Sequence, residues 1–279
     1  MVMRILVTGA NGYMGRHIVP KLCDGGHEVT ACDFSSQGMD PRADFINYDL
    51  LAEAENPNLY NTLKQPETVI HLAWKDGFNH SSPAHLENLP KHYAFIKNMI
   101  DSGAKSVSVM GSMHEIGRYE GCVTAETPCN PLSLYGIAKN ALRQAVLNYA
   151  EDKNTGIKWL RAYYITGDDS SNKSIFAKIL QMANEGKKSF PFTSGVNKYD
   201  FLDVNELAAQ IVAASLQNEI CGIINVCSGK PVALKDKVEQ FIRDKQLDIK
   251  PEYGAFPGRK YDSPAIWGDA DIINKIMKK

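Results

Sequence analysis

The stretch RILVTGANGYMG (residues 4–15) places Gly9, Gly12 and Gly15 at intervals of three, directly after a short apolar run. Residues 5–7 favour a buried strand, because the run is too short for a helix and rich in branched side chains. Apolar residues then recur at helical spacing. A strand, a tight glycine turn and a helix therefore follow one another, and the helix N–H groups suit a pyrophosphate. Three glycines alone are equally compatible with an ordinary strand-to-helix loop.

Composition and charge argue against several classes of protein. The 279 residues are 44% hydrophobic and 23% charged, which is typical of a globular chain of one and a half to two domains. The net charge of −1 gives no electrostatic case for nucleic acid or a membrane surface as partner. No apolar stretch is long enough to span a bilayer, and the first strand leaves no room for a signal peptide.

Cysteine usage indicates the compartment. The six cysteines form neither a C-x-x-C pair nor a metal-binding spacing. We therefore expect reduced thiols, no bound metal and a cytoplasmic protein.

Strand and helix signals alternate through the first part of the chain. Pro90 should disturb the second predicted helix. The strands are predicted at 27–33, 68–74, 106–111 and 157–165, and the helices at 84–103 and 132–153. Alternating units predict an α/β fold, with a doubly wound parallel Rossmann sheet over residues 1–165.

The alternation weakens after residue 167. We expect residues 199–226 to return to the Rossmann domain, and residues 166–198 and 227–279 to form a small C-terminal substrate-binding cap. Glycine and proline break the tail until a last short helix. The elements predicted here are helices at 174–186, 204–217 and 270–278, and strands at 198–204 and 222–229.

Asp33 ends the second predicted strand, 18 residues after Gly15. Dinucleotide-binding domains place a ribose-binding acid about 20 residues after the glycines. A carboxylate there accepts hydrogen bonds from ribose hydroxyls and repels a 2′-phosphate, which favours NAD over NADP. Arg16 is a basic neighbour that would offset part of this preference. A solvated loop acid is the alternative interpretation of Asp33.

Tyr135 and Lys139 lie four residues apart in a predicted helix, so both project from one face. A tyrosine ordinarily titrates near pH 10, and a neighbouring ammonium is expected to lower that value. Such a tyrosine can exchange a proton with an alcohol or ketone while a nicotinamide exchanges hydride. The pair alone is weak evidence, because most such pairs lie on the surface.

Five segments together resemble the extended short-chain dehydrogenases/reductases, in particular the nucleotide-sugar epimerase/dehydratase group. They are TGANGYMG, Asp33, HLAW (71–74), GSMHEIG (111–117) and YGIAK (135–139). YDFLDVNELA and INVCSG are also similar to segments of that family, so the resemblance covers almost the whole chain. It implies an NAD-dependent enzyme acting on a nucleotide sugar. It also implies a homodimer formed through the helices at 84–103 and 132–153.

The resemblance implies a role for particular residues. Tyr135 would transfer the proton, Lys139 would hold the nicotinamide ribose, and the Ser112 hydroxyl would share the substrate oxygen. A strand-end serine that caps a turn is the alternative for Ser112. Arg259 would bind a substrate phosphate, and Lys75 is a further phosphate candidate. The implied cofactor-binding residues are Gly9, Asn11, Gly12, Tyr13, Met14, Gly15, Asp33, Asp49, Leu50, Leu72, Ala73, Trp74, Asn88, Tyr135 and Lys139.

Departures from the family pattern narrow the reaction. Met113 and His114 stand where sugar 4,6-dehydratases carry an Asp-Glu pair, and methionine cannot act as the required acid. The short cap, and Tyr164 where epimerases have asparagine, favour a reductase over an epimerase. His114 occupies the position of a cysteine in GDP-fucose synthases and could transfer a proton. A polar loop residue is the alternative for His114.

We therefore predict an NAD(P)-dependent 4-ketoreductase of a nucleotide-linked 4-keto-6-deoxy-hexose, with Ser112, Tyr135, Lys139 and His114 as catalytic residues. The alternative is a UDP-sugar 4-epimerase that retains its NAD. A non-catalytic dinucleotide-binding sensor is the third hypothesis, which the Tyr-Lys pair disfavours.

Overall fold

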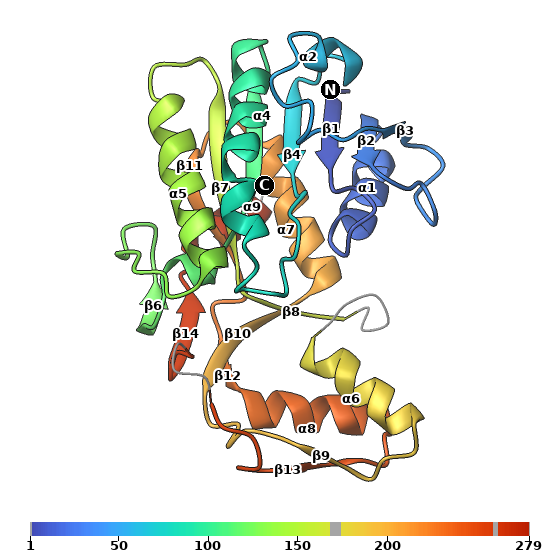
Figure 1. Cartoon of the computed structure of the whole chain (residues 1–279), viewed down its shortest axis with the longest axis vertical. Coiled ribbons are helices and arrows are strands. Elements are labelled where there is room, and N and C mark those ends of the chain that lie inside the picture. Colours follow the sequence, from blue (N-terminus) through green and yellow to red (C-terminus); the bar gives the residue numbers. More distant parts are fainter. Residues whose placement is uncertain (1, 168–173, 259–261, 279) are drawn as a thin grey trace.

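A seven-stranded parallel sheet lies at the centre of the computed structural model, which describes residues 2–167, 174–258 and 262–278 (Figure 1). The strand order is β11-β7-β5-β4-β1-β2-β3. The chain builds outward from β1 on one side and resumes at β4 on the other. The carboxyl ends of β1 and β4 therefore border a topological switch point, where α/β sheets bind ligands. The strands are β1 (Arg4–Thr8), β2 (Glu28–Asp33), β3 (Asp44–Asn47), β4 (Thr68–His71), β5 (Ser106–Ser112), β7 (Gly156–Ala162) and β11 (Gly222–Val226).

Helices cover both faces of this sheet, because alternate residues of each inner strand need an apolar partner on opposite sides. Ile5 and Val7 of β1 belong to one core with α1, α7 and α9, whereas Leu6 belongs to the other core with α2, α4 and α5. The helices of the first face are α1 (Gly15–Asp24), α7 (Val204–Leu216) and α9 (Asp271–Met277). Those of the second face are α2 (Leu59–Thr62), α4 (Leu89–Asp101) and α5 (Leu134–Tyr149).

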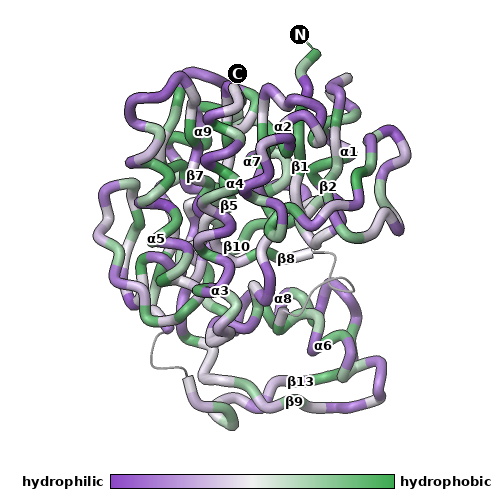
Figure 2. Tube along the Cα trace, turned by 45° about the horizontal axis from the view of Figure 1, so that its top comes forward, coloured by the Kyte–Doolittle hydropathy of each residue, from purple (hydrophilic) through white to green (hydrophobic). Residues whose placement is uncertain are grey.

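A second, mixed sheet lies beyond the carboxyl edge of the first. Its order is β12-β10-β14-β6, and β8 pairs with β10. Figures 1 and 2 show α6, α8, β9 and β13 together at this end of the molecule. A third core, rich in aromatic residues such as Phe176, Phe190 and Tyr199, stabilises this part. Its elements are β6 (Glu120–Val123), β8 (Tyr164–Thr166), α6 (Ile175–Asn184), β9 (Ser189–Pro191), β10 (Lys198–Asp203), β12 (Pro231–Ala233), α8 (Leu234–Asp244), β13 (Lys250–Glu252) and β14 (Ala265–Gly268).

The strand β10 connects the two parts of the protein without a linker. Asp203 is the last residue of β10 and the N-cap of α7, and its carboxylate accepts the amide N–H of Asn205 (2.8 Å). β10 pairs with strands of the second sheet, and α7 packs against α1 on the Rossmann sheet. One continuous stretch therefore belongs to both parts.

The predicted fold class, a Rossmann sheet with a smaller C-terminal part, is confirmed. The helix predicted over 84–103 is divided at Asn88 into α3 (Ala84–Glu87) and α4, with Pro90 in the first turn of α4, where its missing N–H costs nothing. The sequence analysis missed α8 in the tail, which packs Val238 and Phe241 into the third core. α9 falls within the predicted cap range, but it packs on α7 and β11.

Replacing Leu22 with alanine tests the core between α1 and the sheet. Leu22 is fully buried there, so Leu22→Ala should lower the free energy of unfolding by about 2–5 kcal/mol, as measured in urea. Leu132→Ala is the control, because Leu132 is 52% exposed and its truncation should cost less than about 0.5 kcal/mol. Equal effects of the two substitutions would contradict this packing.

Candidate active site

The glycine turn after β1 lies very close to neighbouring backbone. Gly9 has a φ of +65°, and a Cβ there would lie 2.7 Å from the amide nitrogen of Ala73. A Cβ at Gly15 would lie 2.4 Å from the carbonyl oxygen of Ala10 and 2.5 Å from that of Gly9. Side chains do not tolerate such distances, so only glycine lets β1 pass directly into α1. At Gly12 the nearest such contact is a looser 3.1 Å.

Asp33 lies beside this turn, as the sequence predicts. Its Oδ2 accepts the amide N–H of Asn11 (2.8 Å), and its Oδ1 accepts that of Phe34 (2.7 Å). Each carboxylate oxygen keeps a further acceptor position, so the group can still bind ribose hydroxyls. Arg16 donates from Nε to the backbone and side-chain oxygens of Asn11 (3.0 and 2.9 Å). This cation therefore also supports the turn.

Residues 72–74 lead from β4 along the same edge. The amide of Leu72 donates to the carbonyl of Thr8 (3.1 Å), and Ala73 is the residue that Gly9 approaches. The Trp74 ring lies under Lys139, whose Nζ is 3.6 Å from the ring centre. A cation over an indole face at this distance is an attractive contact. Trp74 thereby links the predicted cofactor edge to the predicted catalytic helix.

The remaining cofactor candidates lie in three places. Asp49 and Leu50 follow β3; Leu50 is buried in the core, and Oδ1 of Asp49 accepts an amide N–H of the next turn (3.1 Å). Tyr13 donates its hydroxyl to a backbone carbonyl just after β8 (2.5 Å), and Met14 is the N-cap of α1. Asn88 lies between α3 and α4. Their roles toward a cofactor stay predictions.

Ser112, Tyr135 and Lys139 come together at the carboxyl edge of the sheet. Ser112 is the last residue of β5, and the other two lie one turn apart on α5. The Ser112 side chain lies near enough to the Tyr135 phenol to favour its ionisation, and Nζ of Lys139 is 5.9 Å from the Tyr135 ring centre. Lys139 is 3% exposed and donates to the carbonyl of Met110 (2.7 Å). The arrangement can hold one substrate oxygen between two hydroxyls, with an ammonium nearby.

Burial dominates the proton affinities at this site. It lowers the pKa of Lys139 to about 7, against the opposing effect of the Glu115 charge. It raises the pKa of Tyr135 to about 12, with Ser112 opposing that rise through its hydrogen bond and Glu115 adding to it. The sequence-based expectation of a lowered pKa for Tyr135 is therefore wrong, because burial outweighs the effect of neighbouring groups. The phenolate loses more hydration on burial than these neighbours restore.

Aromatic side chains enclose the Tyr135 ring. His80 stacks on it, with ring centres 5.0 Å apart and an 11° angle between the planes. His85 and His114 meet it edge-on at 5.3 and 5.9 Å, and Trp74 does so at 6.0 Å. His114 is thus brought to the predicted site, while its role stays a prediction. The sequence analysis missed His80, in the loop after β4, and His85, in α3.

The hydrogen-bonded pair His71 and His92 packs against the Trp74 ring. Thr8 Oγ1 lies 2.7 Å from Nδ1 of His71, and Nε2 of His71 lies 2.9 Å from Nδ1 of His92. His92 stacks on Trp74 with ring centres 4.4 Å apart. Burial lowers the pKa of His71 to about 3 and that of His92 to about 2, so both rings are neutral near pH 7. His71 belongs to the buried support of the site.

Trp74 also fixes the proton position on His85. The indole Nε1–H of Trp74 donates to Nδ1 of His85 (3.0 Å). An indole N–H can only donate, so Nδ1 of His85 must accept. Nε2 of His85 then carries the proton and donates to the carbonyl of Asn79 (2.8 Å). His85 is therefore held as a neutral ring facing Tyr135.

A buried carboxylate behind Ser112 also escaped the sequence analysis. Glu115 ends the short helix η1 (Met113–Glu115), is 0% exposed and accepts the amide N–H of Ser112 (2.6 Å). The spacing S-x-x-E is the known signature of a capping box, so the sequence contained the signal for this arrangement.

Two residues were predicted to contact the substrate phosphates. Lys75 is exposed just beyond β4, and Arg259 lies outside the described residues.

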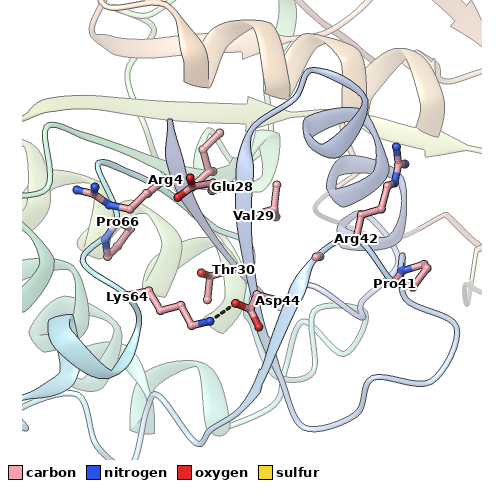
Figure 3. A pocket seen from close by; sticks show the side chains of 11 residues that line it. Arg4, Glu28, Val29, Thr30, Pro41, Arg42, Asp44, Lys64 and Pro66 are labelled. Carbon is pink, nitrogen blue, oxygen red and sulfur yellow. Dashed lines mark hydrogen bonds and ion pairs between the residues drawn. The ribbon is translucent and has the colours of Figure 1, made fainter. Parts of the chain in front are cut away.

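A pocket of about 370 Å³ opens at the other end of the sheet. It is lined at the first residues of β1, β2 and β3, among them Arg4, Glu28 and Asp44 (Figure 3). Lys64 is paired with Asp44, and Arg42 is paired with two aspartates outside the pocket lining. The catalytic candidates lie at the carboxyl edge, so this pocket is not the candidate active site.

The described residues fit a dinucleotide at the glycine turn. The cradle at Gly9 and Gly15 is one that a Cβ would fill, the α1 N-terminus faces it, and Asp33 stands beside it with free acceptor positions.

Among the described residues no cluster of histidine, cysteine or acidic side chains could hold a metal ion. All six cysteines are free thiols. No helix of the described chain is long and apolar enough to cross a membrane.

Two solved structures share this fold. MoeE5, in complex with UDP-glucuronic acid and NAD, superposes with a TM-score of 0.82 at 23% identity, covering 99% of this chain and 92% of that chain. UDP-glucose 4-epimerase of Thermotoga maritima superposes with a TM-score of 0.83 at 21% identity, covering 98% and 92%. At these identities the likeness establishes the fold.

Residues 5–227 match the NAD dependent epimerase/dehydratase family, and the chain belongs to that family. It is 46% identical over 272 residues to dTDP-6-deoxy-L-talose 4-dehydrogenase (NAD(+)) of Aggregatibacter actinomycetemcomitans, covering 95% of this chain and 99% of the relative. It is 24% identical to UDP-arabinose 4-epimerase 1 of Arabidopsis thaliana, covering 99% and 75%. The predicted family, the enzyme class and the NAD dependence of that class are confirmed.

Gly15→Ala tests the glycine cradle. The added Cβ overlaps two backbone oxygens, so the turn must open and NAD binding should weaken at least about tenfold, as measured by calorimetry. Gly258→Ala is the matched control, because a Cβ there meets nothing within 4 Å. Unchanged NAD affinity in a folded Gly15→Ala protein would remove the turn from the cofactor site.

Asp33→Asn tests the choice of cofactor. Loss of the negative charge removes the repulsion of a 2′-phosphate, so the ratio of the Kd for NADP to that for NAD should fall about tenfold. Asp24→Asn, at the exposed end of α1, should leave the ratio unchanged. An unaltered ratio in Asp33→Asn would show that Asp33 does not contact the ribose.

Proposed function

We propose that this protein is an NAD-dependent 4-oxidoreductase that interconverts the 4-hydroxyl and 4-keto forms of a dTDP-linked 6-deoxy-hexose. The observation that carries this proposal is the 46% identity to the dTDP-6-deoxy-L-talose 4-dehydrogenase, which extends over almost the full length of both chains. The 4-ketoreductase expected from the sequence is the same reaction in reverse. The epimerase alternative has weaker support, because the epimerase relatives named above share 21–24% identity.

Three side chains of this chain would carry the proton chemistry. The glycine turn and Asp33 would hold NAD, which would supply hydride-transfer chemistry at C4 of the sugar. Tyr135 would accept the proton of the 4-hydroxyl as a phenolate during oxidation and return it during reduction, and the Ser112 hydroxyl would donate a hydrogen bond to the same oxygen as charge develops there. Lys139, held by the Met110 carbonyl and the Trp74 face, would place a positive charge that favours the phenolate. This charge matters because burial makes the phenol of Tyr135 hard to ionise.

The side chains around Tyr135 are compatible with binding of a sugar ring. The imidazole rings of His80, His85 and His114 lie against the phenol ring of Tyr135, so they would line the space for the sugar. His114 as a second proton-transfer group belongs to this proposal. Lys75 and Arg259 are proposed to bind the substrate phosphates. We further propose a homodimer formed through α4 and α5, and a cytoplasmic location.

Tyr135→Phe tests the reaction. Removal of the hydroxyl leaves the ring packing in place but takes away the proton-transfer group. NAD⁺-dependent oxidation of dTDP-6-deoxy-L-talose, followed as NADH absorbance, should fall about 10²–10⁴-fold. Tyr149→Phe, on the same helix and bonded to Asp101, should keep full activity.

The same assay separates the alternatives. A UDP-sugar 4-epimerase would interconvert UDP-sugars on retained NAD without net NADH formation. Turnover of neither kind, together with measurable NAD binding, would leave a dinucleotide-binding protein without this activity. Either result would overturn the proposed oxidoreductase function.

A further inference from the structure

Glu115 is a fully buried carboxylate directly behind the end of β5. Its oxygens accept the amide N–H of Ser112 (2.6 Å) and the indole N–H of Trp159 (2.9 and 3.0 Å). Gly111 leaves the room for this arrangement, since a Cβ there would lie 2.8 Å from Oε1 of Glu115 and 2.2 Å from Nε1 of Trp159. Gly111 of β5 and Trp159 of β7 therefore both lie against the Glu115 carboxylate.

Two arginines compensate the buried charge. Nη2 of Arg161, on β7, lies 3.5 Å from Oε2 of Glu115, and both side chains are 0% exposed. Nε of Arg143, on α5, lies 3.8 Å from the same oxygen. A buried carboxylate needs such partners because the loss of hydration otherwise disfavours its charged form. An apolar side chain here would leave the indole N–H of Trp159 and the buried charge of Arg161 without their acceptor, so the carboxylate is held in one place by its partners.

The short helix η1 connects Glu115 to the reacting side chains. Ser112 Oγ accepts the amide N–H of His114 (3.3 Å), which completes the capping box with Glu115. η1 also packs tightly on the first turn of α5, where a Cβ at Gly136 would lie 2.3 Å from the His114 carbonyl oxygen. A shift of the Glu115 carboxylate would therefore move Ser112 relative to Tyr135.

We propose that Glu115 is a positioning residue for the reaction at Tyr135. Its carboxylate sets the place of Ser112 through the backbone amide, and its charge acts on Lys139 across the β5–α5 junction. The inference rests on the proposed function for the reaction itself, but not for the electrostatic coupling. Glu115 touches no substrate in this scheme and acts through the residues that do.

The groups facing Lys139 define the expected effect of that charge. Tyr135 lies on the same helix, while His71 of β4 and His92 of α4 are neutral near pH 7 because burial holds their pKa values at about 3 and 2. Glu115 is the anion whose charge raises the pKa of Lys139, against the larger lowering by burial. Arg143 and Arg161 face Glu115 from α5 and β7. Removing the carboxylate charge should therefore lower the Lys139 pKa below its value of about 7.

Two substitutions separate position from charge. Glu115→Asp keeps the charge but withdraws it from the Ser112 amide, so kcat should fall about 10–100-fold with little change in KM or in the pH profile. Glu115→Gln keeps the length but removes the charge, so the alkaline limb of the kcat profile should move to lower pH. Glu126→Gln, the same change at an exposed site, should alter neither quantity.

The ionisation of Lys139 can be followed without substrate, by NMR titration of ¹³Cε-lysine protein with Lys139→Met for assignment. The titration midpoint should fall in Glu115→Gln and stay in Glu115→Asp. If Glu115→Gln does not fold, Arg143→Met serves instead; it removes a cation facing Glu115, so the midpoint should rise.

Wild-type kcat in Glu115→Asp, or an unmoved midpoint in the charge variants, would overturn the inference. Wild-type protein without oxidation activity but with a shifted Lys139 midpoint in Glu115→Gln would instead refute the proposed function and leave the coupling standing.

Discussion

Gly9 approaches the backbone of Ala73 so closely that a methyl group at Gly9 would lie 2.7 Å from the amide nitrogen. This contact sets the separation between the ends of β1 and β4, the two strands that border the topological switch point. The turn then passes into α1 next to Asp33, which accepts the amide N–H of Asn11. Trp74, three residues after the end of β4, then contacts Lys139 of α5. Both the proposed cofactor site and the proposed catalytic site therefore depend on one backbone contact that only glycine permits.

Features that depend on residues close together in the sequence could be predicted, whereas features that depend on residues far apart in the sequence could not. The βα alternation, the glycine turn, Asp33 and the Tyr135–Lys139 pair depend on neighbours within about one element, and local spacing predicts them. β6 and β14 were missed because each is short and their pairing joins residues such as Cys122 and Trp267, far apart in the chain. α8 was missed although its apolar residues have helical spacing, because glycine and proline elsewhere in the tail obscured it.

The candidate active site also combines local patterns, which could be predicted, with long-range contacts, which could not. The Ser112–Glu115 capping box is a local pattern that could have been predicted, but the partners that give it meaning, Trp159 and Arg161, come from β7. His80 reaches Tyr135 from a loop whose path no periodicity describes. The expected direction of the Tyr135 pKa failed for a related reason. A neighbouring charge can be inferred from spacing, whereas the loss of water around a phenol depends on every element that covers it.

The junction at Asp203 has a mechanical consequence. β10 carries the second sheet and passes into α7, which lies on the Rossmann sheet, with the cap hydrogen bond of Asp203 at the joint. A rotation of the smaller part about this point would have to break that cap or drag α7 across α1. A second crossing between the two parts is equally short, because β7 passes into β8 across the single residue Tyr163. Because β10 continues directly into α7, the smaller part keeps one orientation relative to the carboxyl edge of the Rossmann sheet.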